Sequence, residues 1–183
     1  MRLSILVLLA LAVPPSTSVA QTKDNATPAP PDRGTIVSAA RRIVEKARYC
    51  SFVTLGPDGA PQARIVDVFV PDETMVVWIG TNPVTRKVAE VRKDRRATLL
   101  CFDPAGPAYV TLTGHADIVD DPAEKARRWK DDWVAFYKDK NRGEDYVLIR
   151  VRPRRLEIVS YPDKLLNDPS TWRPLSVEFP PER

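Results

Sequence analysis

Beyond Arg48 the sequence consists mostly of short extended runs separated by turn residues, and this pattern limits the possible folds more than any other feature. β-Branched and aromatic residues are common within the runs, and glycine, proline and aspartate fill the gaps between them. The runs that predict strands are Cys50–Leu55, Gln62–Val70, Met75–Ile79, Ala97–Phe102, Tyr109–Val119, Tyr146–Val151 and Arg154–Ser160. Because few helices separate them, the order is not an alternating βαβ pattern, and we expect mostly antiparallel pairing.

Three helices are expected around these strands. Thr35–Arg48 places apolar residues on a helical period with cations on the opposite face, and a short helix opens near Thr85. A third helix begins after Asp121 and runs to about Lys138, because an acid, a proline and a glutamate form a helix-start signature there. We therefore predict an α+β fold, a mainly antiparallel six- to seven-stranded β-barrel, closed or split, with flanking helices.

The two ends of the sequence differ in composition from its centre. Residues 1–20 combine one cation, an apolar run and small residues ending at Ala20, which predicts a secretory signal peptide, with an uncleaved membrane anchor as the alternative. Residues 21–33 are expected to form a disordered linker, residues 34–161 the folded domain and residues 162–183 an irregular tail. The mature protein is thus expected to be secreted or periplasmic, without a membrane partner after cleavage.

Charge and histidine content exclude several functions. The net charge of the whole chain is only +4, and the charges alternate along helices, so a nucleic-acid partner is not expected. His115 is the single histidine, which excludes a histidine-rich metal cluster. We expect it to be a hydrogen-bonded structural residue, with a proton donor or a haem ligand as alternatives. No metal site and no catalytic residue are assigned.

The third expected helix is rich in aromatic side chains that lie near one face. We expect these side chains to form a core or dimer contact rather than a cofactor site. They are Trp129, Trp133, Phe136 and Tyr137.

The two cysteines, Cys50 and Cys101, lie in different predicted strands. Export would permit a disulfide, but the sequence does not show whether the two Cα atoms approach closely enough. We therefore expect two buried free thiols, with a disulfide as the alternative.

The segment from Trp78 to Val91 predicts an anion site. A buried strand ends here in a short loop, and a helix then opens with Thr85 as its cap and Arg86 and Lys87 in its first turn. Cations are mildly unfavourable at the positive end of a helix dipole, but a bound phosphate would make them favourable. The alternative is a solvated helix start with two surface cations.

Arg64 is a second unusual cation, because it shares a strand face with Val66 and Val68. A charge on such an apolar face needs an anionic partner or a path to water. That partner is either a ligand phosphate or a carboxylate of the protein.

The strand order and three motifs resemble the pyridoxamine 5′-phosphate oxidase-like flavoproteins, the FMN-binding split barrels, and in particular their general stress protein 26 branch. The resemblance covers about Ile36 to Tyr161. Its motifs are Ala63-Arg64-Ile65-Val66-Asp67, the block from Gly80 to Val88, and Tyr109-Val110-Thr111-Leu112-Thr113-Gly114-His115-Ala116.

The resemblance implies a homodimer with FMN at the subunit interface. Arg86 and Lys87 would bind the FMN phosphate, and Thr81 would form a hydrogen bond with the phosphate or the flavin edge. Arg64 would lie near the flavin or the phosphate. FAD and a deazaflavin remain open as cofactors.

The chain departs from the true pyridoxamine-phosphate oxidases at its C-terminal end. Those enzymes close a tryptophan, an arginine and a histidine over the flavin, whereas this tail offers Trp172 and Arg173 without a histidine. We therefore expect an exported flavin-dependent oxidoreductase that acts on another small molecule. A non-catalytic flavin or tetrapyrrole binder, and a barrel that has lost its cofactor, are the alternatives.

Overall fold

The computed structural model describes residues 31–138 and 143–180. The expected signal peptide and most of the expected linker lie outside these residues. No helix within the described ranges is long and apolar enough to cross a membrane. In chain order the elements are α1 (Arg33–Ala47), β1 (Tyr49–Leu55), β2 (Pro61–Phe69), β3 (Val77–Thr81), α2 (Arg86–Lys93), β4 (Arg96–Asp103), β5 (Ala108–Val119), α3 (Pro122–Arg127), the 3-10 helix η1 (Asp131–Ala135), β6 (Val147–Ser160) and β7 (Leu175–Glu178).

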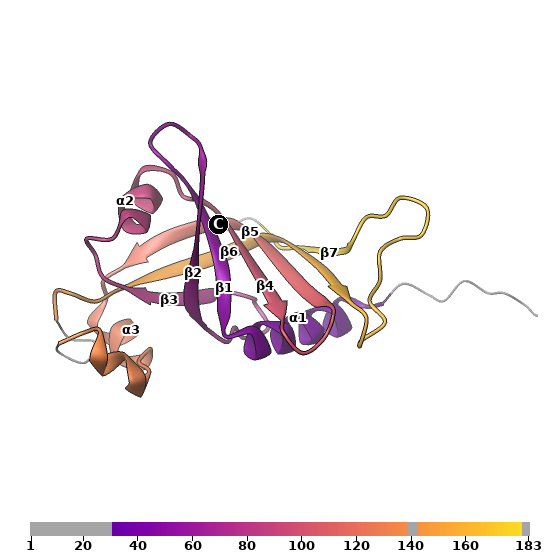
Figure 1. Ribbon diagram of the computed structural model, residues 1–183, viewed down its shortest axis with the longest axis horizontal. Helices are drawn as coiled ribbons and strands as arrows, with labels where there is room; N and C mark the ends of the chain where they lie inside the picture. The colour runs from indigo at the N-terminus through magenta and orange to yellow at the C-terminus, as the bar shows by residue number, and fades with distance from the viewer. Residues whose placement is uncertain (1–30, 139–142, 181–183) are drawn as a thin grey trace, which may run out of the picture. The chain divides into compact units, whose positions relative to one another are not determined.

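Six antiparallel strands form a barrel, and a seventh strand extends the sheet (Figure 1). The strand order is β3-β2-β1-β4-β5-β6-β7, and a further pairing of β3 with β6 closes the barrel. One edge of the long strand β6 serves two partners, because its first part pairs with β3 and its later part pairs with β7. The predicted α+β split barrel is confirmed.

The last strands differ from the sequence prediction. Strand β6 is continuous, although two strands were expected on either side of Pro153. The strand tolerates this proline because Pro153 pairs with Gly114 at a register shift, where a missing N–H is least costly. The tail, expected to be irregular, supplies β7, whose buried Val177 packs against the core.

The third helix is much shorter than predicted. It ends at Arg127, and the chain then forms η1 instead of continuing to Lys138. The Lys130 Nζ atom contacts the Asp67 carboxylate and donates to the Val68 carbonyl oxygen at 2.8 Å, and Lys130 itself has an extended backbone. Tertiary contacts of this kind override local helix propensity.

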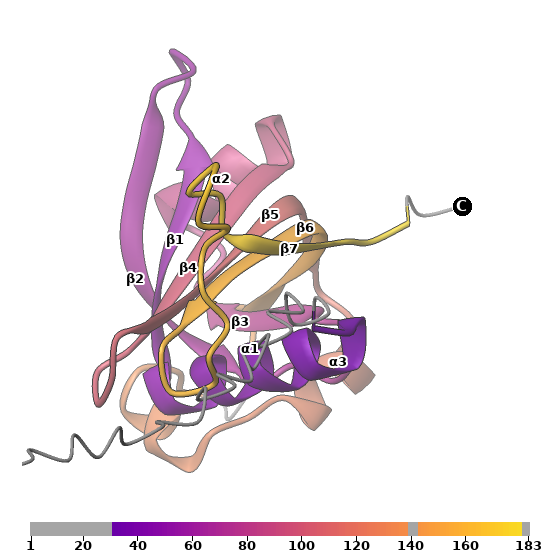
Figure 2. The ribbon, with the colours of Figure 1, turned by 90° about the vertical axis from the view of Figure 1, so that its right-hand side faces the viewer.

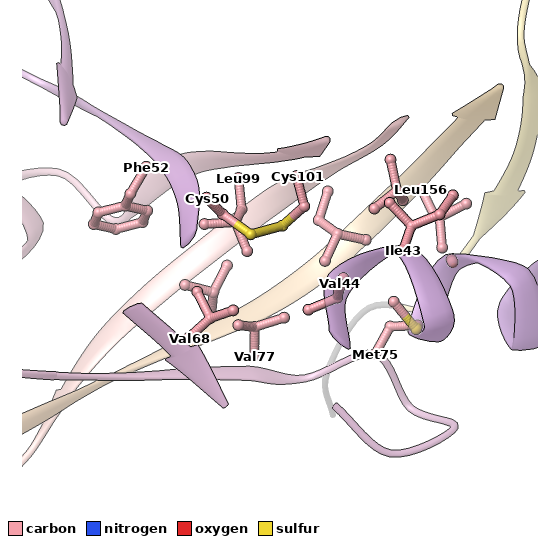
Figure 3. Packing of buried hydrophobic residues seen from close by; sticks show 14 of the residues in the cluster. Ile43, Val44, Cys50, Phe52, Val68, Met75, Val77, Leu99, Cys101 and Leu156 are labelled. Carbon is pink, nitrogen blue, oxygen red and sulfur yellow. A yellow bond between two sulfur atoms is a disulfide. The ribbon is translucent and has the colours of Figure 1, made fainter. Parts of the chain in front are cut away.

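The core lies between the barrel strands and α1, which packs against β4 and β5 (Figure 2). The helix begins where the Asp32 carboxylate accepts a hydrogen bond from the Thr35 N–H at 2.9 Å. Its apolar face, which includes Ile43 and Val44, is buried against the strands (Figure 3).

The expectation of two free thiols is wrong, because Cys50 and Cys101 form a disulfide in this core (Figure 3). The antiparallel register pairs Ser51 of β1 with Leu100 of β4, which places the two cysteines directly opposite each other. Their Cα atoms are 4.5 Å apart, a distance at which a disulfide can form between adjacent strands.

We expect the Cys50→Ala/Cys101→Ala double variant to be less stable than the oxidised parent. The disulfide joins residues separated by 51 positions in sequence. A loop of that size contributes about 3–4 kcal/mol through the lost entropy of the unfolded chain. Urea denaturation followed by circular dichroism would measure the difference. An unchanged free energy of unfolding would show that the bond contributes no net stability.

Candidate functional site

The four residues predicted to bind a cofactor come from three elements near one end of the barrel. Arg64 lies in β2, Thr81 ends β3, and Arg86 and Lys87 open α2. The last turn of α2 approaches the β1–β2 hairpin, where Lys93 donates to the Pro57 carbonyl oxygen at 2.8 Å (Figure 1).

Glu90 of α2 joins two of these cations. Its carboxylate is buried, with 3% of the side chain exposed, and its Oε2 atom lies 2.5 Å from the Arg64 Nη2 atom. The Oε1 atom lies 3.1 Å from the Arg86 Nε atom. Arg64 therefore pairs with a protein carboxylate, the alternative that the sequence analysis left open. The sequence reasoning missed Glu90. The spacing of four residues between Arg86 and Glu90, which allows an ion pair on a helix, was the pattern that could have indicated it.

The Arg64 guanidinium is also held by strand β1. Its Nη1 atom donates to the Thr54 Oγ1 atom at 2.5 Å and to the Phe52 carbonyl oxygen at 3.3 Å. The Thr54 hydroxyl donates in turn to Glu90 Oε2 at 2.5 Å. Because a guanidinium has five N–H groups, this arrangement fixes its orientation and leaves further donors for a ligand.

Lys87 is the third cation of the cluster. Burial is the main factor that lowers the pKa of its ammonium group, and the neighbouring Arg64 lowers it further. Glu90 opposes this shift by attracting the charged form. Three cations thus share one buried carboxylate, so the cluster carries a net charge of about +2 at neutral pH.

Two threonines border the cations. Thr81 is buried, and its hydroxyl oxygen lies 3.3 Å from that of Thr85. The expectation that the Thr85 hydroxyl caps α2 is wrong, because it donates to the Asn82 carbonyl oxygen at 2.8 Å. Among the described residues no side chain caps the first turn of α2. The Val88 N–H donates to the Thr85 carbonyl oxygen at 3.0 Å, and the N–H groups of Arg86 and Lys87 remain available to an anion.

An aromatic cluster packs directly behind the end of β3. A Cβ atom at Gly80 would lie 2.3 Å from the Trp133 ring and 2.8 Å from the Tyr146 ring, so only glycine fits beside Thr81. Trp129, Trp133 and Tyr137 belong to this cluster, which confirms their predicted packing role. Phe136 is exposed instead, because the chain is no longer α-helical at that position.

Three other candidates lie elsewhere. His115 is exposed on β5, and its imidazole makes no hydrogen bond within the described residues, so the expected structural hydrogen bond of the side chain is absent there. Trp172 and Arg173 are exposed in the loop between β6 and β7, on the other side of the barrel from α2 (Figure 1).

Taken together, Arg64, Arg86 and Lys87 can hold one doubly negative group. Its charge would balance the excess of the cluster, and the cations can supply charged hydrogen bonds to its oxygens. The terminal phosphate of FMN is such a group, since a phosphate monoester carries a charge of about −1.5 to −2 at neutral pH. The residues present therefore fit this part of the cofactor.

Comparisons with known proteins agree with the fold. The family model for pyridoxamine 5′-phosphate oxidase matches residues 36–160. General stress protein 26 of Bacillus anthracis is 17% identical, with a TM-score of 0.64 over 79% of this chain and 98% of its own. A related protein of Clostridium acetobutylicum is 20% identical, with a TM-score of 0.66 over 81% of this chain and 96% of its own.

An F420 reductase is 21% identical, with a TM-score of 0.50 over 63% of this chain and 94% of its own. At such identities the likeness of these structures establishes the fold alone. No curated protein sequence matches the chain.

We expect Glu90→Ala to destabilise the protein in the absence of flavin. The substitution leaves Arg64, whose side chain is only 17% exposed, without its ionised partner. Breaking such a pair costs about 2–3 kcal/mol, allowing for the residual exposure of the arginine. Urea denaturation measures the loss, and Arg92→Ala on the exposed face of the same helix serves as the control. Equal stability of the two variants would contradict a stabilising role for Glu90.

Proposed function

Because the chain belongs to the pyridoxamine 5′-phosphate oxidase family, we propose that it binds FMN and acts as a flavin-dependent oxidoreductase on a small molecule. The supporting observation is the convergence of Arg64, Arg86 and Lys87 around one buried carboxylate, that of Glu90. Arg86 is 67% exposed, but Arg64 and Lys87 are partly buried, and positive charge held away from water favours the binding of an anion.

The residues of the chain would have three tasks at this site. Arg86, Lys87 and Arg64 bind the phosphate, and Thr81 offers a hydroxyl to the phosphate or to the flavin edge. The same cations create a positive potential that favours negative charge on the cofactor. FMN, when bound, supplies the hydride or electron transfer, so no catalytic acid or base need come from the chain.

The substrate is not expected to be pyridoxamine 5′-phosphate. A closing segment would have to come from the tail, and Trp172 and Arg173 lie on the other side of the barrel within one chain (Figure 1). The same observation favours a second candidate function, a flavin- or tetrapyrrole-binding protein of a stress response without turnover. Anaerobic reduction of the flavin-loaded protein, followed by reoxidation with candidate acceptors, separates the two functions.

We also propose that the protein works outside the cytoplasm, either secreted or periplasmic. The disulfide between Cys50 and Cys101 supports this location, because such bonds persist mainly in oxidising compartments.

A homodimer is the assembly that we propose. Four large side chains on the outer face of β2, β1 and β4 are 41–65% exposed, and we call them the apolar sheet patch: Tyr49, Ile65, Leu100 and Phe102. Ser51 of β1 pairs with Ile65 of β2 on one side and with Leu100 of β4 on the other. Tyr49 lies two residues before Ser51 and Phe102 two residues after Leu100, so both side chains point to the same face of the sheet. A contiguous apolar patch of this kind favours a protein contact, and here its occupant would be a second copy of the chain.

We expect Arg86→Ala/Lys87→Ala to weaken FMN binding by about 100-fold or more, since each charged hydrogen bond to phosphate contributes about 1.5–3 kcal/mol. Quenching of flavin fluorescence measures the dissociation constant. Riboflavin, which lacks the phosphate, should bind the double variant and the parent alike. FAD and F420 titrated in parallel identify the preferred cofactor.

The matched control is Arg92→Ala/Lys93→Ala, which removes the same charge from the far end of α2. Equal FMN affinity of the two double variants would overturn the phosphate assignment. A parent protein that is colourless and takes up no flavin would overturn the proposed function.

The proposed dimer predicts that Leu100→Glu yields a monomer, because the substitution places a charge in the middle of the apolar sheet patch. Sedimentation velocity measures the assembly. Leu166→Glu, at an exposed leucine of the tail, should leave the dimer intact. A parent that sediments as a monomer at micromolar concentration would exclude a stable dimer.

A further inference from the structure

A β-bulge between β5 and β6 turns two consecutive arginines outward. Thr113 pairs with Arg155 and Gly114 pairs with Pro153, so Arg154 is the extra residue of the bulge. A Cβ atom at Gly114 would lie 2.0 Å from the Arg152 carbonyl oxygen, so the close approach of the two strands requires glycine there. Arg154 and Arg155 are both exposed as a result.

The two arginines differ in how their charge is neutralised. The Arg155 guanidinium pairs with Glu157 at 2.9 Å and also contacts Glu178. The Arg154 guanidinium has neither an ion pair nor a hydrogen bond to any residue within 31–138 or 143–180. The chain thus neutralises one arginine of the bulge and leaves its neighbour available to a ligand.

Arg154 borders a hollow of about 210 Å³ whose wall contains three arginines. The lining residues are Arg95, His115, Arg152, Pro153, Arg154 and Pro180. Two carboxylates lie near this wall. Asp117 is shared by Arg95 at 2.5 Å, by Arg152, and by Arg150 at 3.7 Å, and Asp94, which interacts electrostatically with His115, pairs with Arg96 at 2.6 Å. Arg154 is the cation of this wall that no carboxylate of the described residues neutralises, and its positive charge attracts an anion.

A second hollow, of about 380 Å³, adjoins the first and shares Arg154 and His115 with it. The rest of its wall is largely apolar, with Val53, Leu55, Pro61, Ala97 and Gly114, and it also includes Arg96, Thr54, Thr98 and Thr113. The two hollows together therefore form an apolar trough on the sheet with a cationic end.

We infer that this trough binds a small amphiphilic carboxylate, with its hydrocarbon body over β1 and β4 and its carboxylate at Arg154. Apolar atoms of the body would leave water against the wall of the trough. A guanidinium matches the two oxygens of a carboxylate, and Arg154 has its donors available. The inference goes beyond the proposed flavin function, because the trough uses none of the four predicted cofactor-binding residues.

Octanoate and octan-1-ol are suitable probes, because they differ in charge at equal chain length. Isothermal titration calorimetry should show saturable octanoate binding to the full parent protein, and octan-1-ol should bind about tenfold more weakly or worse. Arg154→Ala should raise the octanoate dissociation constant about fivefold or more and leave the octan-1-ol constant unchanged.

Arg155→Ala is the matched control, since it removes the neighbouring arginine that is already paired. It should bind both probes like the parent. Thr98→Trp fills the apolar wall and should abolish binding of both probes. Circular dichroism verifies that each variant is folded.

Equal effects of Arg154→Ala and Arg155→Ala would overturn the inference, as would equal affinities for the two probes. Absence of saturable octanoate binding would overturn it as well. This outcome is also expected if a second copy of the chain covers the trough. The titrations are performed with and without added FMN. A protein that binds octanoate but no flavin would keep this inference while disproving the proposed function.

Discussion

The pairing of β3 with β6 is the interaction on which the remaining architecture depends. Five register pairs, from Val77 with Val151 to Thr81 with Val147, join strands that are far apart in sequence and close the barrel. The closure fixes the end of β3, and therefore the point where the chain turns into α2. It also places Tyr146 and Trp133 against Gly80, so that the loop to α2 begins beside a cluster of packed aromatic rings. The cations at the start of α2 owe their position to this closure.

Charge balance at Glu90 then explains how the barrel tolerates those cations in the absence of a ligand. A buried carboxylate between Arg64 and Arg86 offsets part of their repulsion, and the hydroxyl of Thr54 supports it. The compensation is incomplete, because Lys87 adds a third positive charge beside the single carboxylate. The protein thus keeps a moderate excess of charge that a phosphate can remove, while the ion pairs hold the arginines in place.

The sequence predicted the features that depend on neighbouring residues and missed several that depend on distant pairing. Alternation of side chains and turn residues predicted the barrel strands, and the order of Thr85, Arg86 and Lys87 predicted the start of α2. The partnership of Cys50 with Cys101 depends on the register between β1 and β4, which no local pattern contains. Strand β7 forms because β6 offers it a free edge, and the third helix breaks because Lys130 binds β2. The four-residue spacing of Glu90 from Arg86 can be read from the sequence. The burial of Glu90 against β1 and β2 cannot, because it depends on how α2 packs against distant strands.

The location of the disulfide has a consequence for how the protein matures. Both cysteines are buried in the core, beneath α1 and between two barrel strands (Figure 3). Small oxidants and thiol–disulfide exchange enzymes need access to a thiolate, and the closed barrel denies them that access. Oxidation must therefore take place while the chain is still open, before α1 and the strands seal the interior. A molecule that closed with its thiols reduced would have to reopen before it could acquire the bond.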